Sequence, residues 1–198
     1  ERKEILENHY VRSHGQTVET FLLVLKDIFN RTHIDDIDGI AITGTGGKLV
    51  SELMNIAFIN EVVAHSTATT TLYPEVRTII EIGGEDSKLM LIERDSSTQQ
   101  TKVSDFSMNT MCAAGTGSFL DQQATRLGVS IEKEFGELAL KSKNPPRIAG
   151  RCSVFAKTDM IHLQQEGTPV YDIVAGLCYA MARNFKSNIG KGKEFLKP

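Results

Sequence analysis

The feature that most constrains the fold is a pair of glycines between two short apolar runs. Residues 77–81 (RTIIE) and 88–93 (KLMLIE) each have the length and apolar content of a strand. Gly83 and Gly84 stand between them and favour a tight turn, because glycine accepts backbone conformations that other residues resist. The sequence therefore predicts two strands joined by a glycine turn.

The same turn carries groups that phosphate chemistry uses. Two glycines let the backbone approach a phosphate closely and present N–H donors to it. The carboxylates of Glu85 and Asp86 can hold Mg²⁺ through water or position an attacking water, and Ser87 adds a hydroxyl donor. A plain hairpin turn explains the same glycines, so both interpretations stay open for this segment alone.

The spacing of apolar residues elsewhere predicts a mixed α/β chain. A strand is expected over 38–43, and another over 102–107 after a polar hairpin tip at 95–101. Helices are expected over residues 16–30, 61–71, 115–127, 131–141, 153–165 and 171–187. The segment 44–49 (GTGGKL) resembles a P-loop at a glance, but it lacks the Ser or Thr that follows the P-loop lysine, so we reject that interpretation.

A second informative segment spans 109–120 (NTMCAAGTGSFL) and combines a cysteine with the start of a helix. Small residues precede the helix, so its first backbone N–H groups are expected to be free to bind an anion. Cys112 stands just before that helix, where a thiolate is favoured electrostatically. A buried core cysteine before a capped helix explains the same residues, and both interpretations stay open.

Cys152 occupies the same kind of position, a loop-to-helix junction about forty residues after Cys112. That separation does not fit the closely spaced cysteine pairs of a zinc finger. Two thiolates are too few for a cubane iron–sulfur cluster, which takes four, whereas a twofold symmetric dimer would supply four. Cys178 is expected to be a core residue within a helix. The five histidines are scattered and are expected to be surface or core residues, not ligands.

Composition argues against several classes of partner. The net charge of -3 gives no electrostatic reason to expect nucleic acid or an anionic membrane as a partner. No apolar run approaches the roughly 18–20 residues that span a bilayer, and no basic, apolar leader opens the chain. Three cysteines cannot all pair with one another, so a disulfide framework is not expected. We therefore expect a cytoplasmic protein that binds neither nucleic acid nor membranes.

Taken together, these segments resemble the BadF/BadG/BcrA/BcrD-type ATPase family, whose best-known members activate 2-hydroxyacyl-CoA dehydratases. The family's phosphate turn, D-I-G-G-Q-D-S-K, corresponds to residues 81–88 (EIGGEDSK). Its cysteine loop, N-D-K-C-A-A-G-T-G-R-F-L, corresponds to 109–120, and its second cysteine motif, C-T-V-F-A-E-S, to 152–158 (CSVFAKT). The order and separation of the motifs also agree, so the resemblance covers nearly the whole chain.

The resemblance implies an α/β fold of the actin-like ATPase type, built of two ribonuclease-H-like lobes with ATP and Mg²⁺ held between them. Residues 1–78 would be the remainder of the first lobe, and residues 79–198 the second lobe with its cysteine-bearing helical part. The family's N-terminal D-x-G-S-T phosphate loop and C-terminal G-G-V adenosine segment are absent from the sequence. The chain is therefore expected to be a segment truncated at both ends, which on its own binds ATP weakly or not at all and is inactive.

Carried across position by position, the resemblance assigns roles to individual residues. Asp86 and Glu85 would be catalytic. Cys112 and Cys152 would be ligands of a [4Fe-4S] cluster. The residues that would contact the nucleotide or its Mg²⁺ are Gly83, Gly84, Ser87, Lys88, Gly115, Thr116 and Gly117. Because Glu81 and Glu85 stand where the family has Asp and Gln, the geometry around Mg²⁺ and water is expected to differ from the family's.

The activity that the resemblance implies is that of an ATP-dependent activase. It would couple ATP hydrolysis to transfer of one low-potential electron to a partner enzyme of the 2-hydroxyacyl-CoA dehydratase or benzoyl-CoA reductase type. The cluster would bridge a homodimer, and a ferredoxin or flavodoxin would be the electron donor. Two alternatives remain at this point: an amino-sugar kinase of the same superfamily, which needs no paired cysteines, and a non-catalytic scaffold that keeps the fold without turnover.

Overall fold

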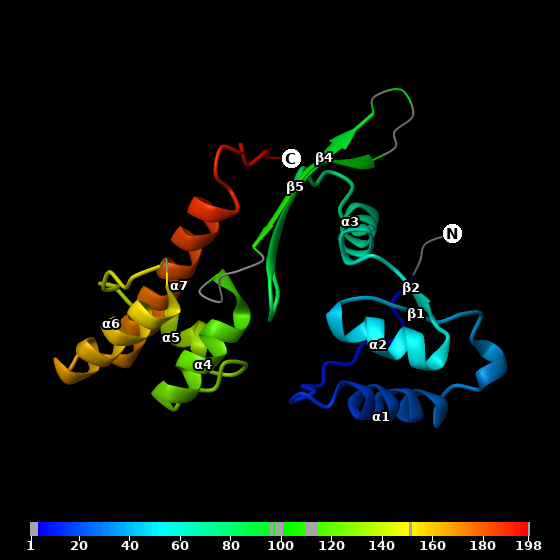
Figure 1. The fold of residues 1–198 in the computed structure, drawn as a ribbon, viewed down its shortest axis with the longest axis horizontal. Helices are drawn as coiled ribbons and strands as arrows, with labels where there is room; N and C mark the ends of the chain where they lie inside the picture. The colour runs from blue at the N-terminus through cyan, green and yellow to red at the C-terminus, as the bar shows by residue number, and fades with distance from the viewer. Residues whose placement is uncertain (1–3, 96, 98–100, 110–114, 151, 198) are drawn as a thin grey trace. The chain divides into compact units, whose positions relative to one another are not determined.

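The computed structural model describes residues 4–95, 97, 101–109, 115–150 and 152–197 (Figure 1). The chain divides into two compact units, Glu1–Ala68 and Thr69–Pro198. The boundary between these units falls within one helix, α3 (Glu61–Leu72). The boundary between lobes that the sequence predicts at 78/79 stays a prediction.

The first unit is a short parallel strand pair with helices. Strand β1 pairs with β2, so that Ala41 lies opposite Ala57 and Ile42 opposite Phe58. The connection between them is helix α2, as parallel strands require a crossover. Gly44 precedes α2 with a φ of 83°, and Asn55 ends it in the left-handed conformation, a common way for a helix to stop. The elements of this unit before α3 are α1 (Thr17–Phe29), η1 (Ile34–Asp36), β1 (Ala41–Ile42), α2 (Thr45–Met54) and β2 (Ala57–Phe58).

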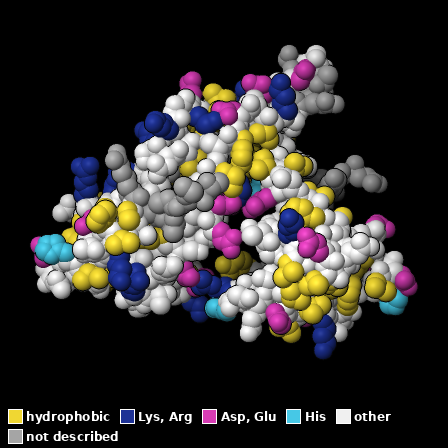
Figure 2. All heavy atoms as spheres, viewed as in Figure 1, with side chains coloured by type: hydrophobic (Ala, Val, Ile, Leu, Met, Phe, Trp, Pro, Cys, Tyr) yellow, Lys and Arg dark blue, Asp and Glu magenta, His cyan; other side chains and the backbone are white. Residues whose placement is uncertain are grey.

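The core of the first unit is small. Among its described residues, only Gly47 and Val50 are buried. Large apolar side chains stay exposed, including Leu23 of α1 and Leu53 of α2. Figure 2 shows hydrophobic side chains gathered over the region of α1 and α2. Exposed apolar patches of this kind usually mark surfaces that other chain segments or partners cover. The buried residues of this unit alone therefore form only a small hydrophobic core.

After the last residues of α3, the second unit forms a three-stranded antiparallel sheet. Its strands are β3 (Thr78–Ile82), β4 (Ser87–Arg94) and β5 (Thr101–Asn109), in the order β3-β4-β5. The β3–β4 hairpin pairs Ile82 with Ser87 next to the glycine turn. The central strand β4 is largely buried, as a strand with a neighbour on each side is expected to be.

Four helices follow and pack into one core. They are α4 (Gly117–Leu127), α5 (Phe135–Lys141), α6 (Ser153–Gln165) and α7 (Val170–Asn188). Helix α7 contacts the other three, and Figure 1 shows it as the longest of the group. Its buried face carries Ile173 and Leu177, which pack among Phe119, Ala156 and Met160. The end of α7 meets the sheet, where Phe185 and Ile189 pack on Leu89 of β4.

Most of the predicted elements are confirmed. The hairpin, α1, α3, β5, α6 and α7 lie where the apolar spacing puts them, and α4 and α5 begin two and four residues later than predicted. The predicted strand over 38–43 is reduced to Ala41–Ile42. Gln16, predicted as the first residue of a helix, is instead the N-cap of α1, which begins at Thr17. Within the described residues, no helix is long and apolar enough to span a membrane.

Candidate functional site

The glycine turn forms the exposed end of the β3–β4 hairpin. The N–H of Gly83 donates to the carbonyl of Asp86 at 2.9 Å, which closes the turn. Gly84 and Glu85 are exposed at its tip. Their backbone N–H groups have no acceptor among the described residues. Two adjacent donors at an exposed turn are the arrangement that backbone anion sites use.

A buried lysine neutralises the carboxylates beside this turn. The Lys88 side chain is only 2% exposed, and Lys88 stands opposite Glu81 in the hairpin register. Its ammonium donates to Glu81 Oε2 at 3.0 Å and also to Asp86 Oδ1. A buried charge requires such partners. The Lys88 ammonium therefore lies between these two carboxylates and fixes the position of Asp86. The predicted contact of Lys88 with a nucleotide stays a prediction.

The turn is clamped to the start of α4. The N–H of Gly117 donates to the carbonyl of Gly83 at 2.7 Å, and the N–H of Ser118 donates to that of Gly84 at 3.1 Å. The Ser87 hydroxyl, fully buried, donates to the carbonyl of Gly115 at 2.6 Å. A Cβ on Gly117 would stand 3.1 Å from the Gly83 oxygen, so glycine permits the close approach.

These contacts correct one expectation from the sequence. The first N–H groups of α4 were expected to be free for an anion, but those of Gly117 and Ser118 are used by the turn carbonyls. The remaining predicted contacts of this region, Gly115 and Thr116, are both buried. Their roles toward a nucleotide, like those of Ser87 and Gly117, stay predictions. Sequence patterns cannot show this clamp, because it joins segments about thirty residues apart.

Of the two predicted cluster ligands, the structure describes only Cys152. Cys112 lies outside the described residues. Cys152 is the N-cap of α6, as the sequence predicts, with an extended backbone and a free thiol.

Cys152 lies on the wall of a groove of about 950 Å³ within the second unit. Three cationic side chains line the same groove, those of Arg147, Arg183 and Lys186. The Arg183 guanidinium donates to the carbonyl of Ile148 at 2.7 Å, which holds the backbone at Ile148 against α7. A thiolate or another anion in this groove would thus meet an excess of positive charge. The sequence reasoning did not find these cations, because they converge only through the packing of the loop on α7.

Cys178 differs from Cys152, as the sequence predicts. It packs against the core from α7, and burial raises the pKa of the Cys178 thiol. Since the thiolate is the reactive form, we expect iodoacetamide at pH 8 to alkylate Cys152 several-fold faster than Cys178 in the folded protein. Mass spectrometry of tryptic peptides, with labelling in urea as the control for intrinsic reactivity, measures both rates. Equal rates in the folded protein would contradict the placement of Cys178.

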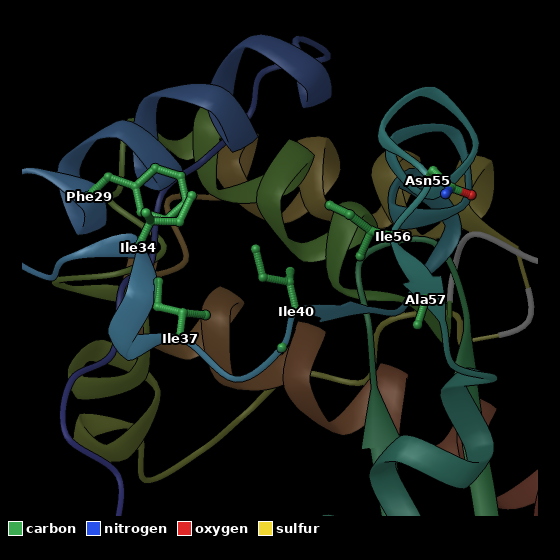
Figure 3. Close-up of a pocket in the computed structure, with 8 residues that line it drawn as sticks. Phe29, Ile34, Ile37, Ile40, Asn55, Ile56 and Ala57 are labelled. Atoms are coloured by element: carbon green, nitrogen blue, oxygen red, sulfur yellow. The ribbon is translucent and has the colours of Figure 1, made fainter.

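A second hollow lies in the first unit and has a different character. It measures about 330 Å³, and its lining includes Phe29, Ile34, Ile37 and Ile40. Figure 3 shows these side chains around a common space. Among the described residues, none of those that line it is charged, and most of them are apolar. Four of the five histidines are exposed, as expected, and His65 is half-buried.

Comparison with known proteins gives one consistent family. The family model described as "BadF/BadG/BcrA/BcrD ATPase family" matches residues 3–195. The 2-hydroxyisocaproyl-CoA dehydratase activator of Clostridioides difficile is 33% identical over 166 residues, which cover 83% of this chain and 59% of that protein.

Two solved structures are similar in fold. The crystal structure of the Acidaminococcus fermentans (R)-2-hydroxyglutaryl-CoA dehydratase component A superposes with a TM-score of 0.75 at 28% identity, covering 87% of this chain and 64% of that one. The activator of the 2-hydroxyisocaproyl-CoA dehydratase from Clostridium difficile, with bound ADPNP, gives a TM-score of 0.72 at 32% identity, covering 84% and 60%. The chain thus spans about three fifths of the length of these relatives.

Proposed function

The chain belongs to the BadF/BadG/BcrA/BcrD ATPase family, and from that premise we propose that the complete protein is an ATP-dependent activase. Its fold is the mixed α/β fold of the actin-like ATPase activators, as the sequence predicts. In the proposed reaction, ATP hydrolysis drives transfer of one electron to a partner enzyme of the acyl-CoA dehydratase or reductase type. The relatives' names, which describe dehydratase activators, support this choice of partner.

The observation that carries the proposal is the exposed glycine turn with its adjacent carboxylate. The N–H groups of Gly84 and Glu85 would donate to the terminal phosphates of ATP. Asp86, held by Lys88 through Oδ1, keeps Oδ2 for a Mg²⁺-bound or attacking water. The bound ADPNP of the Clostridium difficile activator supports a nucleotide as the ligand.

The chain also offers a path from the nucleotide to the cysteines. Loss of the terminal phosphate would release the turn. The hydrogen bonds that the carbonyls of Gly83 and Gly84 accept from the start of α4 would then pass the movement of the turn to that helix. Cys112 precedes the first residue of this helix, Gly117, by five positions in the sequence. The electron would enter from a ferredoxin or flavodoxin.

Cys152 fits the role of an iron ligand. Its thiol is free, it caps a helix, and cations line the same groove. A [4Fe-4S] cluster, when bound, would supply one-electron chemistry at low potential. Cys112 and Cys152 of one chain provide two thiolates, so a homodimer would complete the set of four.

Anaerobic reconstitution of the complete protein with iron and sulfide tests this proposal. The broad visible absorption of thiolate-bound iron is expected in the wild type and in the matched control Cys178→Ala. It is expected to disappear in Cys112→Ala and in Cys152→Ala. A wild type that takes up no iron, or one whose ATP hydrolysis depends on an amino sugar, would contradict the activase and favour the kinase alternative.

A further inference from the structure

Asn184, in the last turn of α7, is a buried amide that joins two loops. It is 1% exposed, and its Nδ2 donates to the carbonyl of Gly150, two residues before Cys152. Its Oδ1 accepts a hydrogen bond from Asn188 Nδ2 at 3.0 Å, which sets the orientation of the amide. A buried amide that is replaced leaves its partners unsatisfied, so this side chain has few tolerated substitutes.

The other side of the same amide lies against the loop that precedes α4. A Cβ added to Gly115 would stand 2.8 Å from Asn184 Oδ1, which shows how closely the Gly115 backbone approaches the side chain. Gly115 in turn accepts the hydrogen bond of Ser87, the first residue of β4 after the glycine turn. Asn184 therefore stands between the segment bound to the turn and the segment that leads to Cys152.

The loop at Gly150 is itself packed tightly on α7. A Cβ on Gly150 would stand 2.6 Å from the carbonyl oxygen of Ala180, so the backbones touch there without room for a side chain. With Arg183 bonded to Ile148, the loop has little freedom to move independently of α7. A displacement of the α7 end is thus passed on to the residues just before Cys152.

From these contacts we propose that Asn184 is a positioning residue, which transmits the state of the glycine turn to the Cys152 loop. The route runs from Ser87 through Gly115 to Asn184, and from there to Gly150. This inference rests on the proposed function in one respect: it takes a nucleotide as the ligand of the turn. It adds a residue that lies outside the three sequence motifs.

Hydrogen–deuterium exchange on the complete protein, with and without a non-hydrolysable ATP analogue and Mg²⁺, tests the route. In the wild type, the nucleotide is expected to slow exchange at residues 83–87 and to change exchange at residues 149–153. In Asn184→Ala and in the bulkier Asn184→Leu, protection at 83–87 is expected to remain, while the response at 149–153 is lost. A purely structural role would raise exchange at 149–153 equally with and without nucleotide, and would leave the response in place.

The matched control is Gln123→Leu. Gln123 is another 1% exposed amide of this unit, but it bonds within its own helix, to the carbonyl of Phe119. This variant is expected to keep the response at 149–153. A response that persists in both Asn184 variants overturns the inference, as does a wild type whose turn is protected while 149–153 does not respond. A wild type without protection at 83–87 overturns the proposed function itself, and the inference with it.

Discussion

Replacing Lys88 with methionine is expected to lower the free energy of unfolding by about 3–5 kcal/mol, the cost of breaking a buried ion pair from one side. The Lys88 side chain is 2% exposed, and its ammonium pairs with both Glu81 and Asp86. Methionine fills a similar volume, so little of the loss would come from a cavity. The two carboxylates would instead be left without a counter-charge and would repel each other. The glycine turn would also lose the contact that fixes the Asp86 carboxylate, the group that we propose to be catalytic.

Urea denaturation followed by circular dichroism measures the effect, since the chain contains no tryptophan for fluorescence. The matched control is Lys102→Met on β5. Its ion pair with Glu93 is exposed, with side chains 72% and 52% accessible, and exposed pairs of this kind contribute at most about 1 kcal/mol. Equal losses in the two variants would show that Lys88 does not act as a buried counter-charge.

Gly176→Ala is expected to destabilise the protein by about 1–3 kcal/mol, even though alanine favours a helix more than glycine does. The added Cβ would stand 2.7 Å from the carbonyl oxygen of Pro146 and 3.0 Å from Ile148 Cδ1. The first of these atoms belongs to the backbone, so the whole 146–150 segment would have to shift. Because this segment leads to Cys152, the variant is also expected to change the rate at which iodoacetamide alkylates that thiol.

Gly136→Ala gives the opposite expectation and serves as the control. Gly136 also lies in a helix, α5, but apart from its chain neighbours and the backbone of its own helix, no described residue has an atom within 4 Å of a Cβ built there. Only the higher helix propensity of alanine then affects stability, and the free energy of unfolding is expected to rise by up to about 1 kcal/mol. Both variants are measured by the same urea denaturation. Stabilisation by Gly176→Ala would mean that the 146–150 segment does not pack against α7 as described.

Much of the second unit could be predicted from the sequence because its signals are local. The glycine pair between apolar runs defines the hairpin, and helical spacing gives α6 with both of its ends. The position of Cys152 at the N-cap of α6 follows from the same pattern. Helix α2 was missed because it begins with Thr45, Gly46 and Gly47, which are poor helix formers, and tertiary packing overrides that weak propensity.

The parts of the site that escaped prediction depend on contacts between distant segments. Sequence spacing cannot show that Ser87 bonds to Gly115 or that Asn184 bonds to Gly150, since these pairs are 28 and 34 residues apart. The ion pairs of Lys88 with Glu81 and Asp86 were not predicted either, and its predicted contact with a nucleotide stays a prediction. Sequence motifs thus identify candidate site residues, whereas their burial and their hydrogen-bond partners become visible only in the structure.

Steady-state ATP hydrolysis by the complete protein tests the central claim, that the turn at 83–88 is a working nucleotide site. Asp86→Ala is expected to lower kcat by about 10²–10⁴-fold, the usual contribution of a group that positions or activates the attacking water. Asp105→Ala is the control, because Asp105 is an exposed β5 carboxylate paired with Lys193. This variant is expected to hydrolyse ATP at the rate of the wild type. Hydrolysis unchanged in Asp86→Ala would contradict the account and favour a non-catalytic scaffold.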